Sequence, residues 1–315
     1  MVPKLVEQGH KVRALVHRSR IGLKGLDIEI IKGSLSDIDS LNELARGADV
    51  LIHLAAYISL TRNKVEENKC LEINVAGTRN VLEAARIQRV PRVIHTSSVH
   101  AALAKGPSYA VDHKTQLNLG PGVDHYSRTK ALAEQEAIKA FKQGREIVIV
   151  RPTAVIGPKD YRPSDLGLFI DDFLKRKVPA LVTGGFDFVD ARDVSKGIIL
   201  AAEKGRPGQP YFLSGRYATV RELAEILEQS SGVKKPAFTF PGRVAKMATP
   251  LASVYYDLTG KRPRFTRYSI EHLEKGSRVD RSLSERHLGY TPRPLEDTIA
   301  DTVRWFGSGE FNRED

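Results

Sequence analysis

Cysteine is almost absent from this sequence. Cys70 is the only one in 315 residues, so no disulfide can form within the chain. Folding without disulfides is typical of a reducing compartment. No apolar segment follows Met1 as it would in a secretory signal, and no apolar run reaches the ~18 residues of a membrane-spanning helix. Together these absences predict a cytoplasmic protein without a transmembrane segment.

Basic residues are numerous, but they are not gathered into one tail or array. The formal net charge is +11, with local clusters at 17–20 and 261–267. Surfaces that bind nucleic acid favour long basic tracts or basic residues interleaved with aromatic ones, and the sequence has neither. We therefore expect no nucleic acid partner. A basic background suits an anionic cofactor or a small anionic substrate instead.

The first two-thirds of the sequence alternates apolar strands with amphipathic helices. Strands are predicted at 11–17, 28–32, 50–55, 92–96 and 146–151, and helices at 37–46, 67–88 and 125–142. This alternation is typical of an α/β fold, a doubly wound parallel sheet with helices on both faces. After Pro152 proline and glycine are more frequent and strands are sparser. Helices at 219–228 and 295–306 belong to this second part.

Tyr126 and Lys130 lie four residues apart in the helix predicted at 125–142. Residues at this spacing share one face of a helix. A neighbouring ammonium favours the phenolate, so the phenol can give or take a proton near neutral pH. The hydroxyl residues at 96–98 follow a predicted strand, at the edge where parallel sheets bind ligands. The pattern predicts chemistry that makes a carbonyl from an alcohol, or the reverse.

Seven short segments, taken in order, match a single pattern. They are His53-Leu-Ala-Ala56, Asn74-Val-Ala-Gly-Thr78, Val93-Ile-His-Thr-Ser-Ser98, Tyr126-Ser-Arg-Thr-Lys130, Arg151-Pro-Thr-Ala-Val-Ile-Gly-Pro158, Phe188-Val-Asp-Ala-Arg-Asp-Val194 and Leu288-Gly-Tyr-Thr-Pro-Arg-Pro-Leu295. In this order they resemble the extended short-chain dehydrogenase/reductases. That family includes NAD-dependent epimerases and dehydratases, dihydroflavonol-4-reductase-like enzymes and 3β-hydroxysteroid-dehydrogenase-like enzymes. The resemblance implies a Rossmann-like sheet, a smaller C-terminal substrate lobe and an NAD(P)-dependent reaction.

The resemblance also divides the chain into two parts. Residues 1–151 would form the nucleotide-binding domain, and 187–214 would return to its sheet. The substrate lobe and the C-terminal helices would take 152–186 and 215–315.

Catalytic roles follow from the resemblance. Tyr126 would be the general acid/base, and Lys130 would lower its pKa and bind the nicotinamide ribose. Ser98 would hydrogen-bond the substrate oxygen, with Thr96 or Ser97 as alternatives.

Other residues are expected to support the site. Asn74 would hold the long helix and a proton-relay water, or would simply cap the following helical turn. Asp190 and Asp193 are expected to fix the loop before the helix at Val194. Contacts to the cofactor are expected from Leu54, Ala55, Ala56, Thr96 and Pro152, and no metal site is expected.

The end of the strand at 11–17 predicts NADP as the cofactor, with NAD as the alternative. Sheets that prefer NAD place Asp or Glu there to bind the ribose 2′-hydroxyl. This sequence has His17 and Arg18, and a guanidinium pairs with a 2′-phosphate. Ser34 replaces the family's usual acid before Leu35, so an acidic contact to adenine is lost, although Leu35 can still pack on the ring.

The family's first strand and its glycine-rich turn, G-x-x-G-x-x-G, are absent from this sequence. The chain begins at residues that resemble the second half of the first helix. In the sheet order 3-2-1-4-5-6 that strand is central, so the strands at 11–17 and 50–55 are expected to lack their shared neighbour. Two explanations are open: an upstream start that supplies the strand, or a short form that is inactive or needs a partner strand.

The expected reaction is oxidoreduction between a secondary alcohol and a ketone. Ser98 is followed by Val99-His-Ala101, not by the Asp-Glu pair of the family's dehydratases or the Ser-Ala-x-Val-Tyr-Gly of its epimerases. We expect a medium-sized, partly apolar substrate. The alternatives are a non-catalytic nucleotide-binding relative and a sugar-nucleotide epimerase. In the epimerase, phosphates would be contacted by Arg262, Arg264 and Arg267.

Specificity and assembly are less determined by the sequence. Aromatic side chains of the second part would line a substrate pocket or pack a core, and these are Tyr161, Phe169, Phe186, Tyr255 and Tyr256. The helices at 67–88 and 125–142 are candidates for a homodimer interface, because family members often dimerise through them.

Overall fold

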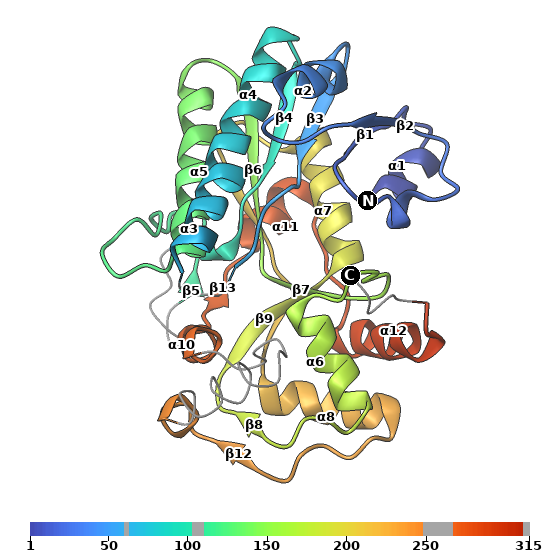
Figure 1. The fold of residues 1–315 in the computed structure, drawn as a ribbon, viewed down its shortest axis with the longest axis vertical. Helices are drawn as coiled ribbons and strands as arrows, with labels where there is room; N and C mark the ends of the chain where they lie inside the picture. The colour runs from blue at the N-terminus through green and yellow to red at the C-terminus, as the bar shows by residue number, and fades with distance from the viewer. Residues whose placement is uncertain (60–62, 103–109, 248–266, 311–315) are drawn as a thin grey trace.

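The computed structural model describes residues 1–59, 63–102, 110–247 and 267–310 (Figure 1). Two parts follow one another along the long axis of Figure 1. The larger part holds a parallel sheet between helices, and the smaller part holds a short sheet packed on helices.

A four-stranded parallel sheet forms the centre of the larger part. Its strands, in order, are β10 (Pro210–Leu213), β6 (Glu146–Pro152), β4 (Arg92–Thr96) and β3 (Val50–His53). The register places His53 opposite His95. Ile147 to Val150 are fully buried, as in parallel strands with helices on both faces. The sheet confirms the predicted α/β class.

Helices cover both faces of this sheet. One face packs against α2 (Ile38–Ala45), α4 (Gly77–Ile87) and α5 (His125–Lys142), and the other against α7 (Ala191–Lys204) and α11 (Ser282–Leu288). Asp37 and Asp124 begin α2 and α5, because each side chain accepts hydrogen bonds from backbone N–H groups of the first turn. The predicted cap at Asp37 is confirmed, and α5 has the predicted ends.

The first two strands stand apart from the central sheet. After α1 (Val2–Glu7), β1 (Arg13–Val16) and β2 (Glu29–Lys32) form a separate two-stranded parallel sheet. All four residues of β1 are half-buried, and Val50 at the start of β3 is 38% exposed. In the described part of the chain β1 pairs only with β2 and β3 only with β4. These two strands therefore share no neighbouring strand there.

The helix predicted at 67–88 begins earlier and changes its winding. α3 (Lys64–Cys70) begins after Asn63, whose side chain accepts a hydrogen bond from Glu66 N at 2.8 Å. A π-helical segment, Leu71–Ala76, then leads into α4. Such segments are frequent at functional sites. The predicted long helix is confirmed as one continuous helical run from Lys64 to Ile87, but the spacing of apolar residues does not show its change of winding.

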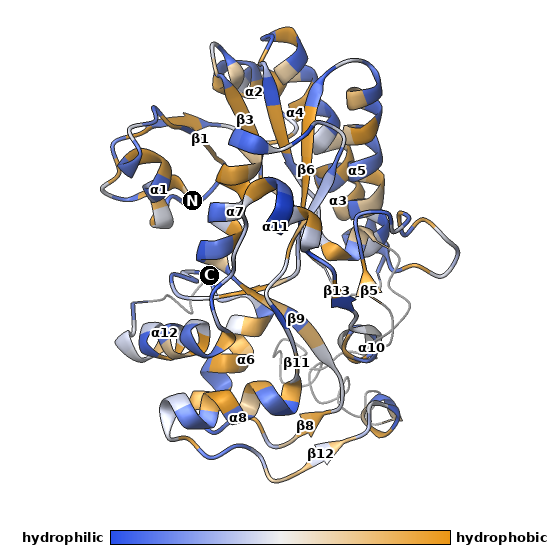
Figure 2. Ribbon diagram, turned by 180° about the vertical axis from the view of Figure 1, so that it is seen from behind, coloured by the Kyte–Doolittle hydropathy of each residue, from blue (hydrophilic) through white to orange (hydrophobic). Residues whose placement is uncertain are grey.

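The smaller part has a core of its own. Its three-stranded sheet has the order β11 (Arg216–Thr219), β9 (Gly185–Asp190) and β7 (Ala154–Ile156). Against it pack α6 (Asp165–Leu174), α8 (Val220–Ser231), α10 (Arg267–Lys275) and α12 (Leu295–Ser308). Two short pairs are β8 (Leu181–Val182) with β12 (Thr239–Phe240), and β5 (Ala110–Val111) with β13 (Arg278–Val279). Figure 2 shows hydrophobic residues along β6, α6 and α8.

The chain passes between the two parts more than once. β9 belongs to the small sheet, whereas α7 and β10, which follow it, pack in the larger part. The domain boundaries given above remain a prediction. Among the described residues, no helix combines the length and the apolar character that crossing a membrane requires.

Candidate active site

α5 places Tyr126 and Lys130 one turn apart on its buried side. They are 7% and 4% exposed. Lys130 Nζ donates a hydrogen bond to Thr96 O at 2.9 Å, which fixes the ammonium at the end of β4. The pair therefore lies at the carboxyl end of the central sheet, the edge at which such sheets bind ligands.

The hydroxyl residues at the end of β4 have three different surroundings. The Ser98 side chain lies beside Tyr126, where it acts to lower the pKa of the phenol, and its Oγ accepts a hydrogen bond from His100 N at 3.2 Å. Ser97 Oγ donates to Glu134 Oε2 at 2.5 Å. Thr96 Oγ1 is buried and has no hydrogen-bond partner within the described ranges. Of the three, Ser98 is the one with its hydroxyl at the phenol.

Burial dominates the proton affinities of the pair. It raises the pKa of Tyr126 to about 12, against a smaller opposite effect of the Ser98 side chain. It lowers the pKa of Lys130 to about 8, against the attraction of the Glu134 carboxylate. The sequence predicted a lowered pKa for Tyr126. In the protein without ligands burial outweighs that effect, because the phenolate would lose its water.

Asn74 ties the loop after β3 to α5. Its Oδ1 accepts a hydrogen bond from Tyr57 N at 2.7 Å, and its Nδ2 donates to Tyr57 O at 2.9 Å and to Thr129 Oγ1 at 3.1 Å. Thr129 in turn donates to Tyr126 O at 2.9 Å. Asn74 lies inside the π-helical segment, so the alternative that it caps a helix N-terminus is wrong. Its side chain braces two segments that meet near the phenol.

Two buried imidazoles lie near Lys130. His53 Nε2 lies 2.9 Å from Thr78 Oγ1, and burial lowers its pKa to about 3. The ring of His95 lies 5.7 Å from that of His53, and neither of its nitrogens has a partner among the residues described. Burial also lowers the pKa of His95. Both rings are therefore neutral at pH 7.

His100 and His272 were not predicted as site residues. The ring of His100 packs edge-on against Tyr126, with centroids 5.6 Å apart, and contacts the ring of His272 at 4.6 Å. His272 Nε2 lies 3.3 Å from Asp124 Oδ2. His100 follows the serines closely, so its position in the sequence could have indicated it. His272 is distant in the sequence, and only the folding of α10 brings it here.

The exposed end of β3 fits a flat ligand. Leu54, Ala55 and Ala56 follow the strand directly and are all exposed, Leu54 at 44%. Small or apolar side chains at this edge let a ligand approach the backbone closely. Pro152, the last residue of β6, is buried nearby in the same sheet.

The ends of β1 and β2 fit an anionic nucleotide. His17 and Arg18 are exposed after β1, and neither has an ion pair in the part of the chain that the structure describes. After β2, Ser34 Oγ hydrogen-bonds Ser36 Oγ at 2.9 Å. Leu35 packs so closely on Gly77 that a Cβ there would lie 2.9 Å from it. A free guanidinium and a fixed apolar side chain suit a phosphate and an adenine ring.

Comparisons with known proteins agree with this geometry. The model of the NAD dependent epimerase/dehydratase family matches residues 1–213. The chain belongs to this family. Sterol demethylase protein B of Methylococcus capsulatus is 36% identical, over 97% of this chain and 94% of that protein. The predicted membership of the extended short-chain dehydrogenase/reductases is thereby confirmed.

Two further proteins are similar to this chain over nearly its whole length. A 4-hydroxy-2-methyl-3-oxo-4-farnesyl-3,4-dihydroquinoline-1-oxide ketoreductase of Stigmatella aurantiaca is 31% identical, over 98% of this chain and 92% of that protein. The crystal structure of gox2253 has a TM-score of 0.85 and 29% identity, over 99% of this chain and 95% of that one. The Rossmann-type fold of the NAD dependent epimerase/dehydratase family is thus confirmed.

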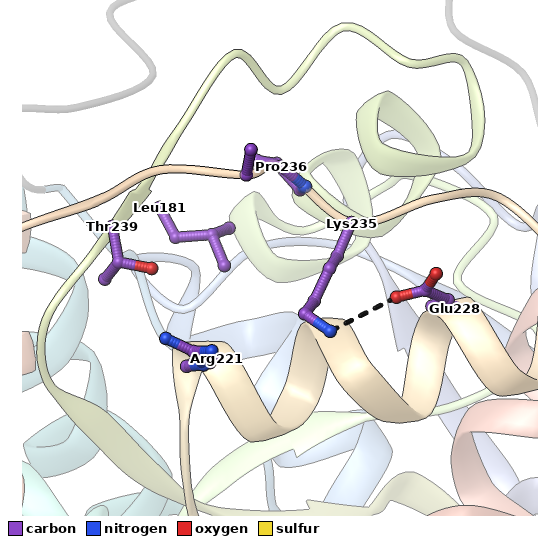
Figure 3. Close-up of a pocket in the computed structure, with 7 residues that line it drawn as sticks. Leu181, Arg221, Glu228, Lys235, Pro236 and Thr239 are labelled. Carbon is purple, nitrogen blue, oxygen red and sulfur yellow. Dashed lines mark hydrogen bonds and ion pairs between the residues drawn. The ribbon is translucent and has the colours of Figure 1, made fainter.

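The smaller part of the present protein has a pocket that Tyr126 does not line. Figure 3 shows this pocket of about 230 Å³, lined by residues of β8, α8 and β12 and of the segment between α8 and β12. Its charged side chains are paired: Lys235 Nζ lies 3.4 Å from Glu228 Oε2 within the lining, and Arg221 Nε lies 3.3 Å from Oε1 of Glu225, which does not line the pocket. No group of three His, Cys, Asp or Glu side chains in the described residues could hold a metal ion.

Two aspartates near α7 are structural, as predicted. Asp190 caps α7, and its Oδ2 lies 2.6 Å from Arg192 NH2. Asp193 Oδ1 lies 3.0 Å from Arg293 NH2. These pairs fix the start of α7 against the segment that leads into α12.

Three of the aromatic candidates belong to the core of the smaller part. Tyr161 packs on Trp305 with ring centroids 5.1 Å apart, and Phe186 packs on Phe188 at 6.0 Å. Phe169 packs against the same core. The remaining candidates lie outside the described residues or have side chains that do, and these are Tyr255, Tyr256, Arg262, Arg264 and Arg267.

Proposed function

We propose that this protein is an NADP-dependent oxidoreductase that interconverts a secondary alcohol and a ketone. One observation carries the proposal: α5 buries Tyr126 and Lys130 one helical turn apart, and Lys130 Nζ donates a hydrogen bond at 2.9 Å to Thr96 O, at the strand end that is followed by Ser98. The nicotinamide cofactor, when bound, would supply or accept the hydride. Tyr126 would give its hydroxyl proton to the ketone oxygen on reduction and take it back on oxidation. Ser98 would hydrogen-bond the same oxygen and orient it.

The protonation states suit this assignment. A pKa of about 12 keeps Tyr126 protonated near pH 7, as a proton donor to a ketone must be. Lys130 uses one N–H for Thr96 O, which leaves two donors for a ribose hydroxyl and for the developing phenolate. Asn74 would hold Thr129, and with it the backbone of Tyr126, in place.

NADP is favoured over NAD by the groups at the strand ends. His17 and Arg18 offer positive charge where a 2′-phosphate would lie, and no carboxylate of the described residues pairs with Arg18. A carboxylate there would instead suit the 2′-hydroxyl of NAD. The remaining contacts to the cofactor would come from Ser34, Leu35, Leu54, Ala55, Ala56, Thr96 and Pro152.

The substrate is proposed to be medium-sized and partly apolar. Two relatives are named for a sterol and for a farnesyl-bearing quinoline ketone, both bulky and apolar. The neutral, half-buried ring of His100 beside Tyr126 also suits an apolar molecule better than a sugar diphosphate. Two further proposals are a cytoplasmic location and a homodimer through α3, α4 and α5. α3 exposes Val65 at 73%, which supports the homodimer.

Turnover with a panel of carbonyl compounds tests the proposal. NADPH or NADH oxidation would be followed with a steroid ketone, a prenylated aromatic ketone and a UDP-4-keto sugar, and UDP-glucose epimerisation would be assayed separately. We expect consumption of NADPH with the apolar ketones, faster than of NADH. Epimerisation of UDP-glucose without net oxidation of cofactor would overturn the proposal.

A further inference from the structure

Glu134 and Arg151 form an ion pair inside the larger part. Their side chains are 0% and 3% exposed, and Arg151 NH2 lies 2.5 Å from Glu134 Oε1. Arg151 Nε also donates to Glu134 Oε2 at 3.0 Å, so the pair is bidentate. Ser97 Oγ donates to the same Oε2 at 2.5 Å. A carboxylate on α5 is thereby fastened to β6 and to the end of β4.

Stability alone does not account for such a pair. Removing two charges from water is costly, and apolar residues of similar volume are often as stable in the same place. Arg151 NH1 is in addition buried without a hydrogen-bond partner among the residues described. The pair is therefore better explained by what the carboxylate does for its neighbours than by its contribution to folding.

The neighbours of Glu134 on its own helix are the proposed reacting groups. Tyr126, Lys130 and Glu134 follow one another at intervals of four residues, so they form a row on one face of α5. Lys130 Nζ donates a hydrogen bond to Thr96 O. Thr96 is the last residue of β4, and Ser97 follows it directly. Two hydrogen bonds thus join this face of α5 to the end of β4: one from the Lys130 ammonium to Thr96 O, and one from Ser97 Oγ to the Glu134 carboxylate.

We propose that Glu134, held by Arg151 and Ser97, is the positioning residue that keeps Lys130 cationic and seated against the end of β4. The role rests on the proposed function, in which Lys130 must hold a ribose and support the phenolate. Glu134 touches neither substrate nor cofactor and acts through Lys130.

Among the groups around Lys130, Glu134 is the anion, and Arg151 of β6, its ion-pair partner, is a second charged group. On α5 these groups are Tyr126, a neutral phenol at pH 7, and Glu134 itself. From β3 and β4, His53 and His95 face the ammonium, and burial keeps both neutral. Glu134 is the only charged group of the described residues that raises the pKa of Lys130. Without it, Lys130 would lose its proton at a lower pH.

A paired substitution tests the role without leaving a buried charge alone. Glu134→Gln with Arg151→Met removes both charges together, because Glu134→Gln alone would strand the guanidinium and risk unfolding. The control is Glu146→Gln with Arg92→Met, which removes a pair at 3.0 Å between the first residues of β4 and β6, at the opposite end of the strands from Lys130. The conservative variant Glu134→Asp keeps the carboxylate.

The titration of Lys130 is the direct readout. The Cε and Nζ signals of labelled lysine would be followed by NMR against pH, with Lys130 identified by its loss in Lys130→Arg. We expect the Lys130 midpoint to fall by up to about one pH unit in Glu134→Gln/Arg151→Met, because the carboxylate lies one turn from Lys130 on α5, whereas the guanidinium that is removed with it comes from β6. We expect the Lys130 midpoint to stay unchanged in the control pair and to fall less in Glu134→Asp than in Glu134→Gln/Arg151→Met. An unchanged Lys130 midpoint in the first variant would overturn the role of Glu134.

Ketone reduction with NADPH, measured over pH 5–9, separates this inference from the proposed function. If both hold, the limb of the kcat/KM profile that reports Lys130 moves to lower pH together with the NMR midpoint. If the wild type reduces no ketone, the proposed function fails, while the NMR titration still decides whether Glu134 sets the charge of Lys130. If the midpoint moves but the activity profile does not, the carboxylate has no part in the reaction and the positioning role is refuted.

Discussion

His272 Nε2 lies 3.3 Å from Asp124 Oδ2, so α10 of the smaller part contacts the residue that begins α5. Ile270 and Leu273 anchor α10 in the core of the smaller part. The same histidine packs on His100, which packs on Tyr126. His272 thereby joins the smaller part to the proposed site.

Loss of this contact is expected to loosen substrate binding more than chemistry. His272→Leu removes the polar contact to Asp124 but keeps a side chain of similar bulk against His100. We expect the KM for the ketone to rise about two- to tenfold, with a smaller change in kcat. Steady-state kinetics would show this, with exposed His10→Leu as the control. An equal fall in kcat with an unchanged KM would contradict the account.

Charge at the end of β1 is expected to set cofactor preference. Arg18→Glu replaces a guanidinium that can pair with a 2′-phosphate by a group that repels it. We expect the Kd for NADPH to rise about tenfold or more and that for NADH to change little. Fluorescence titration of both cofactors measures this, with exposed Lys24→Glu as a control for net charge. Equal weakening of both cofactors would show that Arg18 does not read the phosphate.

Asn74 is expected to stabilise the fold as well as the site. Asn74→Ala removes its hydrogen bonds to Tyr57 and Thr129 and leaves buried groups without partners. We expect the free energy of unfolding to fall by about 1–3 kcal/mol, measured by urea denaturation. Thr129→Val, which removes only one of these contacts, should cost less. If the two variants cost the same, the Tyr57 contacts contribute nothing.

Asp187 is expected to make stability depend on pH. Its Oδ1 accepts hydrogen bonds from Thr153 Oγ1 at 2.9 Å and Gly215 N at 3.0 Å, yet burial raises its pKa from 3.8 to about 6. A raised pKa means that the folded state favours the proton, so the cost of the carboxylate grows as pH rises from ~4 to ~6.

An Asp187→Asn substitution tests that cost. It should raise the free energy of unfolding at pH 7.5, by up to about 3 kcal/mol, and change it little at pH 4. Thermal unfolding at the two pH values measures the difference. A gain of the same size at both pH values would mean that charge is not the cause.

The secondary structure that depends on local signals was predictable from the sequence. α5 has the predicted ends because Asp124 caps it and because the apolar period ends where Gly144 follows. The π-helical segment around Asn74 was not predictable, since its winding depends on the fit of that side chain to Tyr57 and Thr129. The burial that raises the pKa of Tyr126 likewise depends on tertiary packing. The four-residue spacing in the sequence shows only that Lys130 lies beside Tyr126 on the helix.

The proposed site divides in the same way. Tyr126, Lys130 and Ser98 are brought together as their spacing and strand position indicated. His272 reaches the site region from an element distant in the sequence, and no local pattern marks it; Arg151 lies in one of the matching segments, but its pairing with Glu134 could not be read from that segment. Contacts of that kind become visible only when the strand order is known.

The most direct test of the account is Tyr126→Phe, assayed for reduction of the best ketone found with NADPH. The substitution removes one hydroxyl and leaves the buried ring, so the fold and the Kd for NADPH should stay within about twofold of wild type. We predict that kcat falls by about 10²–10⁴, the usual contribution of a positioned general acid. A variant that binds NADPH and turns over as fast as wild type would contradict the proposed function.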